Sequence, residues 1–289
     1  MQTIKDFNDY ELIDASLGMK YERWGKYYLL RPDPEALWDN GDLSIKYNGK
    51  IDAIYHRSNT GGGHWENLKK VPESWSINYK DLTFNIKQMG FKHTGLFPEQ
   101  AVNWEFMSHK IKNADREISV LNLFAYTGGA TVVCSKAGAS VVHVDASRGM
   151  TDWAKENANS SGLSDRPIRY LVDDCIKFVK REIRRGHKYD AIIMDPPSYG
   201  RGSNGEVWNF SKDILELINL CMKILSDKPL FFQINSYTTG ISPTVLENIL
   251  RLKFKNYDGV CSSSEIGIPL SSCNLVLPCG IYGRWESND

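Results

Sequence analysis

The chain has 289 residues, with 35 Lys and Arg against 35 Asp and Glu, so its net charge at pH 7 is zero. Hydrophobic residues make up 42% and charged residues 24%, a globular composition that excludes intrinsic disorder as a class. Acids and bases are also balanced within residues 1–116 and within residues 117–289. Nucleic-acid binding driven by bulk positive charge is therefore excluded, and any such surface must be local.

Neither a membrane span nor a targeting segment is expected. No run approaches the roughly 18 apolar residues of a span, and the first residues, MQTIKDFNDYELID, are acidic and polar. None of the six cysteines forms a CxxC pair, so we expect no metal site, no disulfide framework and a cytoplasmic protein.

Residues 1–88 are expected to form a small β-rich N-terminal domain. Residues 27–32 predict a strand that ends at a proline, and predicted strands 43–47 and 51–56 flank Asn48-Gly49, a dipeptide typical of hairpin turns. We expect the tryptophans of this domain to form its core rather than a platform for base stacking. Residues 89–117 are expected to be a linker with a helix over 99–112, begun by Pro98.

From residue 118 onward, apolar runs alternate with amphipathic stretches. The predicted strands are 120–124, 141–145, 168–172, 191–195 and 230–235, followed by a closing pair, 257–264 and 275–282. The predicted helices between them are 129–137, 151–160, 176–185, 212–225 and 243–252. This pattern predicts an α/β domain over 118–289, with a Rossmann-like, doubly wound, mostly parallel seven-stranded sheet and an antiparallel last strand.

The first strand of this sheet leads into Gly128-Gly129. Ligands of open α/β sheets bind at the carboxyl ends of the strands. Glycines at such a turn let backbone amides approach a ligand and face the helix N-terminus toward an anion. The third glycine of the dinucleotide fingerprint is missing, and a tight turn without a ligand is the alternative.

Carboxylates follow the next two strands. Asp145 lies about twenty residues after the glycine turn and suits a ribose diol, a feature shared by proteins that bind nicotinamide cofactors and by those that bind S-adenosylmethionine. Asp174 can accept an adenine amine or cap the following helix, and the two roles are compatible.

The fourth strand leads into Asp195-Pro196-Pro197, which we predict to be the catalytic residues. Two prolines remove backbone donors and fix φ, so the carbonyls of a rigid turn point outward. Together with Asp195, these carbonyls can accept hydrogens from a planar amine beside a methyl donor. We disfavour a purely structural turn.

In this order the motifs resemble those of class I S-adenosylmethionine-dependent methyltransferases. Segments 120–129, 144–147, 171–178 and 190–208, with 95–100 upstream, look like the bacterial 23S rRNA large-subunit methyltransferase group, in a stand-alone subgroup without a PUA-type domain. The resemblance covers residues 90–289.

The resemblance implies S-adenosyl-L-methionine as the cofactor and RNA as the partner. The residues that it implies for the cofactor are Phe124, Tyr126, Gly128 and Gly129 at the methionine end, Asp195 with Pro196 near the sulfonium, Asp145 at the ribose, Ala146 and Ser147 beside the adenine, Asp174 at its amine, and Phe97 with Gln100 as a cover.

The resemblance also bears on the methylated atom. Cytosine-C5 members carry a cysteine after the fifth strand, where this chain reads Asn235-Ser236-Tyr237-Thr238. Methylation of carbon-5 needs a thiolate, so we expect transfer to a nitrogen or an oxygen.

Candidate substrate residues follow the fourth and fifth strands. They are Ser198, Tyr199, Arg201 and Tyr237, with Arg201 in a glycine-rich 200–205 loop expected to act as a lid. A basic strip is expected to be a solvated helix face, with RNA contact as the alternative; it comprises Lys177, Lys180, Arg181, Arg184, Arg185 and Lys188.

Three other functions stay open at this point. A methyltransferase for a small molecule or protein fits the neutral charge. A nicotinamide-dependent oxidoreductase is opposed by the missing third glycine and the Asp-Pro-Pro turn, and a non-catalytic RNA-binding protein on the same fold is the last alternative. The sequence sets neither the substrate nor the oligomeric state.

Overall fold

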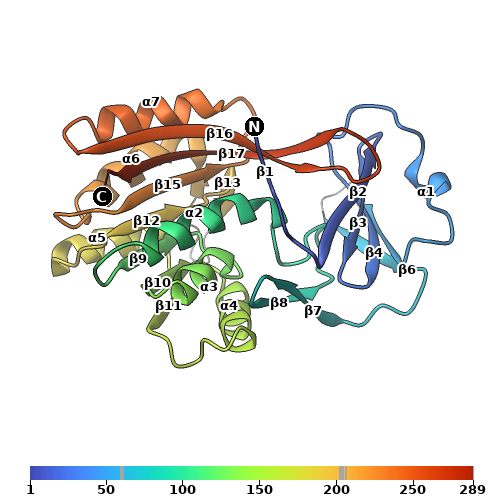
Figure 1. The fold of residues 1–289 in the computed structure, drawn as a ribbon, viewed down its shortest axis with the longest axis horizontal. Helices are drawn as coiled ribbons and strands as arrows, with labels where there is room; N and C mark the ends of the chain where they lie inside the picture. Colours follow the sequence, from blue (N-terminus) through green and yellow to red (C-terminus); the bar gives the residue numbers. More distant parts are fainter. Residues whose placement is uncertain (59–61, 202–204, 206, 289) are drawn as a thin grey trace. The chain divides into compact units, whose positions relative to one another are not determined.

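The computed structural model describes residues 1–58, 62–201, 205 and 207–288, and Figure 1 labels their elements. These residues form two compact units. The α/β unit contains Met1 and residues 103–265 and 280–289, and the N-terminal unit contains residues 2–102 and 266–279. The domain boundaries expected after residues 88 and 117 remain predictions.

The large sheet has the strand order β1-β16-β17-β15-β12-β9-β10-β11. Strands β9, β10, β11, β12 and β15 pair in parallel with one another, whereas β17 runs antiparallel to β15. This confirms the expected mostly parallel, doubly wound sheet with an antiparallel last strand, to which β1 adds a two-residue eighth strand beside β16. The bounds are β1 Gln2–Thr3, β9 Ser119–Leu123, β10 Ser140–Asp145, β11 Ile168–Val172, β12 Ala191–Met194, β15 Phe231–Ser236, β16 Gly259–Pro269 and β17 Val276–Ser287.

The helices between these strands confirm the predicted alternation. They are η1 Pro98–Gln100, α2 Ala101–Lys112, α3 Gly129–Lys136, α4 Arg148–Ser160, α5 Cys175–Arg185, α6 Phe210–Met222 and α7 Pro243–Lys253. Side chains cap three of them, because Ser147, Asp174 and Asn209 each accept a backbone N–H of the first turn. Among the described residues, no helix is long and apolar enough to cross a membrane.

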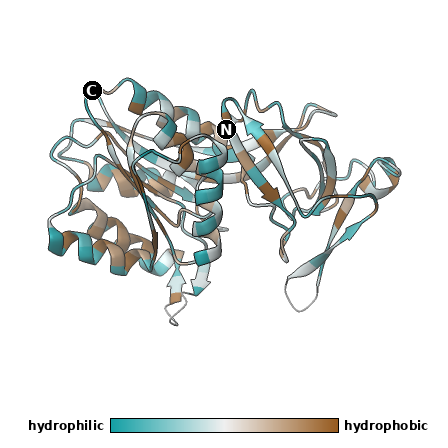
Figure 2. Ribbon diagram, turned by 90° about the horizontal axis from the view of Figure 1, so that it is seen from below, coloured by the Kyte–Doolittle hydropathy of each residue, from teal (hydrophilic) through white to brown (hydrophobic). Residues whose placement is uncertain are grey.

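The two faces of the large sheet differ in chemistry. One face packs the apolar side chains of β9, β12 and β15 against helices α5, α6 and α7. On the other face a polar row crosses five strands in register, with Ile193 as its apolar member; it comprises His143, Asn122, Ile193, Gln233 and Arg284. Figure 2 shows that the helices of the α/β unit carry both hydrophobic and hydrophilic residues, as expected of helices that cover a sheet.

Each polar member of the row is tied to a neighbour. Arg284 donates to the Gln233 and Asn103 side-chain oxygens at 3.1 and 3.0 Å, and its guanidinium lies 3.4 Å from the ring centroid of Phe106. Burial lowers the pKa of Arg284 to about 10. The row therefore joins α2 to the sheet through hydrogen bonds and a cation–π contact.

The N-terminal unit is β-rich, as expected. A five-stranded sheet has the order β2-β3-β4-β5-β6, and β7 and β8 form a separate hairpin. The bounds are β2 Tyr10–Ser16, β3 Met19–Trp24, β4 Tyr27–Pro32, β5 Ala53–Arg57, β6 Gly63–Asn67, β7 Ser74–Tyr79 and β8 Leu82–Lys87.

The predicted hairpin of strands 43–47 and 51–56 is wrong. Leu43–Lys46 is a short helix, α1, because the Asp42 side chain caps it by accepting the Ser44 N–H. Strand β5 instead pairs in parallel with β4 and antiparallel with β6. The turn at Asn48-Gly49 does form, since the Lys50 N–H donates to the Tyr47 carbonyl at 3.0 Å, but it follows a helix instead of a strand.

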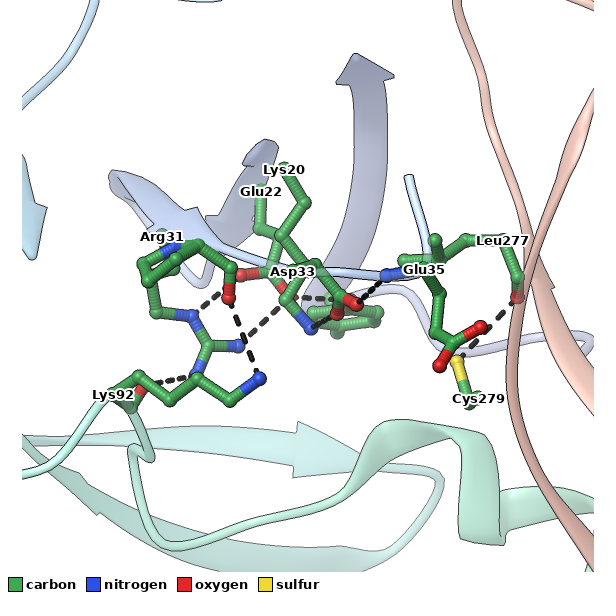
Figure 3. Close-up of polar contacts among 10 residues, drawn as sticks. Lys20, Glu22, Arg31, Asp33, Glu35, Lys92, Leu277 and Cys279 are labelled. Carbon is green, nitrogen blue, oxygen red and sulfur yellow. Dashed lines mark hydrogen bonds and ion pairs between the residues drawn. The ribbon is translucent and has the colours of Figure 1, made fainter. Parts of the chain in front are cut away.

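A buried ion-pair cluster lies on β3 and β4 of the N-terminal unit (Figure 3). Arg31 donates two hydrogen bonds to the Glu22 carboxylate, at 2.7 and 2.9 Å, and Tyr10 donates a third at 2.7 Å. Lys20 bridges to Asp33 at 3.1 Å. Burial raises the pKa of Glu22, but the charges of Arg31 and Lys20 outweigh burial and lower it to about 2. The cluster is thus charged and fully bonded inside this unit.

Removing one partner of this cluster should destabilise the N-terminal unit strongly. Arg31→Met leaves the Glu22 carboxylate buried without its main counter-charge, which costs about 3–5 kcal/mol. Glu66→Gln is the control, because its partner His56 and Glu66 itself are 43% and 51% exposed, and such a pair contributes at most about 1 kcal/mol. Urea unfolding followed by tryptophan fluorescence measures both; equal losses would contradict the assignment.

Candidate functional site

Segments that follow parallel strands meet at the carboxyl edge of the large sheet. The Asp195 N–H donates to the Leu123 carbonyl at 3.3 Å, and the Asp173 N–H donates to the Asp145 carbonyl at 3.0 Å. The structure therefore brings the predicted segments after β9, β10, β11 and β12 together at one edge.

The turn between β9 and α3 has an unusual backbone. Phe124, Tyr126 and Gly128 have φ values of +53°, +52° and +81°. The left-handed region costs a non-glycine residue about 1–2 kcal/mol, and such residues concentrate at functional sites. Hydrogen bonds hold this 124–129 turn: the Ala125 N–H donates to the Val144 carbonyl at 3.1 Å, and Asn157 donates to the Thr127 carbonyl at 2.8 Å.

Both glycines of the turn are required by their surroundings. A Cβ at Gly128 would lie 2.8 Å from the Ala154 Cβ, and one at Gly129 would lie 2.8 Å from the Trp104 ring. Gly128 also precedes the first residue of α3. The turn therefore brings a helix N-terminus and bare backbone to the sheet edge, an arrangement suited to an anionic or polar ligand.

Asp145 is the anchor of this turn. Its two carboxylate oxygens accept the Tyr126 N–H and the Ser147 N–H, each at 2.8 Å. Burial raises the pKa of Asp145, and these two donors oppose the rise. Each oxygen retains a further lone pair, so the carboxylate can still accept hydroxyl protons of a ribose.

The acidic pair after β11 has two roles. The Asp174 side chain accepts the Lys177 N–H at 2.8 Å and caps α5, as expected. Asp173 forms an ion pair with Arg181. Next to them Cys175 accepts the Phe124 N–H at 3.4 Å; its thiol is buried, and burial raises its pKa well above the usual value.

The segment after β12 contains the Asp-Pro-Pro turn. Asp195 is half-buried, Pro196 is buried, and Pro197 and Ser198 are exposed. The Thr238 hydroxyl, after β15, donates to the Ser198 hydroxyl at 3.0 Å. The fourth and fifth strand ends therefore meet at this turn.

The expected 200–205 loop is in part a strand, because Gly200 and Arg201 belong to β13 Tyr199–Arg201, whereas Gly205 lies outside the strands. Strands β13 and β14 Val207–Asn209 pair antiparallel, and α6 starts directly after them. Residues 202–204 of the expected lid lie outside the described residues, and the role of this loop as a lid stays a prediction. On the hairpin, Arg201 donates to the Tyr199 hydroxyl at 3.2 Å.

Two residues of this edge were not predicted. Asn157 carries the bond to the Thr127 carbonyl, and Trp208 donates its indole N–H to the Pro197 carbonyl at 2.7 Å. Trp208 is the last residue of the 190–208 segment that carries the family resemblance. Its place as an aromatic residue after a glycine-rich stretch is the sequence signal that could have identified it.

Below the turn lies a buried polar chain. Asn122 donates to the Thr131 hydroxyl, which lies 2.9 Å from His143 Nδ1. Within the described part of the chain, His143 Nε2 finds no partner. Burial lowers the pKa of His143 to about 3, and the charge of Lys155 adds to the effect. A neutral imidazole therefore supports the turn.

Some predicted residues are not joined to this edge by these contacts. Phe97 and Gln100 belong to the N-terminal unit, and their role as a cover stays a prediction. Tyr237 is half-buried beside Gly280, where a Cβ would lie 2.9 Å from its ring.

The site fits the cofactor that the resemblance implies. A left-handed turn, a bare helix start and a carboxylate with spare lone pairs lie at one edge, as the polar ends of an adenosine-bearing ligand require. The described residues contain no cluster of three or more His, Cys, Asp or Glu that could hold a metal ion.

A family model described as S-adenosylmethionine-dependent methyltransferase matches residues 47–248. A solved structure, the SAM-dependent methyltransferase from Agrobacterium tumefaciens, is 36% identical, with a TM-score of 0.93 over 98% of this chain and 92% of that chain. SMU.776, solved in complex with SAH, has a TM-score of 0.75 at 18% identity over 97% of this chain and 76% of that chain, a likeness of fold.

Curated relatives share part of the chain. "Ribosomal RNA large subunit methyltransferase K/L" from Shewanella frigidimarina is 34% identical over 145 residues, which is 50% of this chain and 20% of that protein. The protein of the same name from Colwellia psychrerythraea is 29% identical over 168 residues, 57% of this chain and 22% of that protein. The chain thus spans under a quarter of the length of these relatives.

The neutral His143 should make stability depend on pH. Its pKa is about 3 in the folded protein and about 6.5 unfolded, so the unfolded state binds the extra proton between these values. The titration of His143 therefore costs no stability above pH 6.5. Below that pH the free energy of unfolding falls on acidification, by up to about 1.4 kcal/mol per pH unit. Unfolding by urea from pH 7 to 4 should show a shallower pH slope for His143→Asn than for the natural protein; equal slopes would contradict this.

Gly128→Ala should disrupt the 124–129 turn. It combines a positive φ with the 2.8 Å approach to Ala154, whereas the control Gly162→Ala has φ +69° and no atom within 4 Å of its Cβ. We expect Gly128→Ala to weaken S-adenosylhomocysteine binding at least tenfold, about 1.4 kcal/mol. Calorimetry on both variants checks this, and an unchanged affinity for Gly128→Ala would remove the turn from the site.

Proposed function

Because the chain belongs to the S-adenosylmethionine-dependent methyltransferase family, with S-adenosylmethionine as its cofactor, we propose that it methylates RNA of the ribosomal type at a nitrogen or an oxygen. The observation that carries this proposal is the Asp-Pro-Pro turn, with Asp195 half-buried and Pro197 exposed, at the same sheet edge as the 124–129 turn. Support for RNA comes from the names of the curated relatives. The proposal places the reaction in the cytosol.

In this proposal the cofactor residues are those of the sheet edge. The 124–129 turn receives the methionine end, Asp145 receives the ribose, and Ala146, Ser147 and Asp174 lie at the adenine. Asp174 can accept the adenine amine while it caps α5, since the cap bond uses one of its two carboxylate oxygens. Phe97 and Gln100 are proposed as a cover.

The chain's own residues orient the acceptor. When bound, S-adenosylmethionine supplies an activated methyl group on a sulfonium, so alignment is the main task of the protein. Asp195 and the Pro196 carbonyl accept hydrogens from a planar amine and direct its lone pair. Asp195 then takes the proton that the methylated nitrogen releases.

Two thiols bear on the expected nitrogen or oxygen chemistry. Cys175 is buried, and burial raises its pKa; Cys279, in the N-terminal unit, also has a raised pKa because of burial. A nucleophilic cysteine requires a lowered pKa and access to the substrate. These surroundings favour transfer to a heteroatom over cytosine carbon-5.

The β13–β14 hairpin supplies the proposed RNA contacts. Paired residues of a hairpin share a face, so Tyr199, Arg201 and Val207 lie together, and Tyr199 and Val207 are 54% and 59% exposed. A tyrosine ring can stack on a base and an arginine can bind a phosphate. Ser198 and Tyr237 are proposed as further substrate contacts.

The RNA proposal is tested with labelled S-adenosylmethionine and ribosomal RNA from a strain that lacks this chain. We expect label in RNA, and nucleoside mass spectrometry should place it on a nitrogen or an oxygen. RNA from the parent strain, already modified, is the control. Label confined to small molecules or proteins, or found in 5-methylcytosine, would refute the proposal.

Two substitutions should separate cofactor binding from methyl transfer. Asp195→Ala removes the acceptor-orienting carboxylate, so transfer should fall about 100-fold or more, with S-adenosylhomocysteine affinity changed little. Asp145→Ala removes a ribose acceptor and the Tyr126 anchor, so affinity should fall about tenfold or more. Calorimetry and transfer assays are run on both; the reverse pattern would exchange the two assignments.

A further inference from the structure

Trp208 connects two parts of the site that lie on different segments of the chain. It faces Gly200 across the β13–β14 hairpin and is only 8% exposed, whereas its neighbour Val207 is 59% exposed. Its indole N–H donates to the Pro197 carbonyl at 2.7 Å. Its ring packs against Phe124, with centroids 4.9 Å apart and an angle of 54° between the rings.

The Pro197 contact bears on the acceptor side. The Asp195 N–H ties the start of the Asp-Pro-Pro turn to the Leu123 carbonyl. Pro196 and Pro197 have no N–H, so their carbonyls are the hydrogen-bonding groups through which the rest of the turn can be held. Downstream, Phe210 donates its N–H to the Ser198 carbonyl at 3.0 Å. The indole bond reaches one of the prolines themselves, two residues after Asp195.

The Phe124 contact bears on the cofactor side. Phe124 has φ +53°, a conformation that its own Cβ disfavours. A tilted aromatic pair contributes about 0.5–1.5 kcal/mol beyond the buried area, which offsets much of that penalty. The Trp208 ring therefore helps to keep the first residue of the 124–129 turn in place.

We infer that Trp208 is a positioning residue that sets the geometry of the acceptor turn through its N–H and that of the cofactor turn through its ring. It contacts neither the methyl group nor the acceptor. The inference rests on the proposed function only where methyl transfer is measured. Because the N–H and the ring of one side chain perform the two tasks, two substitutions can separate them.

Trp208→Phe keeps an aromatic ring against Phe124 and removes the N–H. We expect the affinity for S-adenosylhomocysteine to stay within about threefold, and kcat to fall about tenfold or more with KM for RNA unchanged. Trp208→Leu also removes the ring, so it should lower kcat and weaken S-adenosylhomocysteine about tenfold. Calorimetry and steady-state kinetics give these values.

The control is Trp65→Phe, which removes a comparable indole bond, 2.9 Å to the Met89 carbonyl in the N-terminal unit. It should leave kcat and S-adenosylhomocysteine affinity unchanged. The thermal midpoints of all three variants are also measured. If Trp208 had a purely structural role, the loss of kcat would follow the loss of stability, whichever tryptophan is changed.

Hydrogen exchange distinguishes this inference from the proposed function, since it needs no acceptor. Backbone amides of 198–201 should exchange faster in Trp208→Phe than in the natural protein, and should be unchanged in Trp65→Phe. If the natural protein methylates no RNA, the proposed function fails, while exchange and affinity still decide the role of Trp208. Natural exchange in Trp208→Phe, or natural affinity in Trp208→Leu, would overturn the inference.

Discussion

The Asp145 carboxylate holds a backbone turn that would not persist alone, and the functional edge of the sheet depends on that bond. Phe124 and Tyr126 both occupy the left-handed region, at a cost of about 1–2 kcal/mol each. The bond from the Tyr126 N–H to Asp145 is charge-assisted and half-buried, so it contributes about 1.5–3 kcal/mol. A carboxylate that is needed for a ribose thereby also shapes the turn that receives the rest of the ligand.

The polar row explains how the sheet can support this strained edge. On the side of α5, α6 and α7 the strands present mainly apolar residues, which pack but do not specify a register. On the opposite side Asn122, Gln233 and Arg284 require hydrogen-bond partners from defined atoms, and an unmet requirement costs free energy. The apolar face thus supplies stability, and the polar face fixes strands and helices in one arrangement.

The sequence predicted most of the α/β unit because its elements follow local periodicity, and the Asp174 cap was visible in the same way. It failed where distant contacts or caps decide the structure. Asp42 turned residues 43–46 into a helix, although Asn48-Gly49 indicated a hairpin. Likewise, the bond from Trp208 to Pro197 spans eleven residues and depends on a hairpin that a glycine-rich stretch conceals. Spacing along the chain indicates periodic elements, whereas these contacts are set by pairing between separate segments.

On α5, the balance of charge in this chain is visible as ion pairs between basic and acidic side chains. Acids pair with three of the six residues of the basic strip: Lys180 pairs with Glu216 at 2.8 Å, Arg185 with Glu182 at 3.2 Å, and Arg181 with Asp173. Phosphates would have to displace these carboxylates, so the strip is a poor electrostatic footprint for RNA. The exposed face of the β13–β14 hairpin has no such competition from acids among its described residues, Tyr199, Arg201 and Val207. Recognition by one stacking ring and one guanidinium next to the Asp-Pro-Pro turn is therefore compatible with zero net charge, since it relies on shape and placement rather than on bulk attraction.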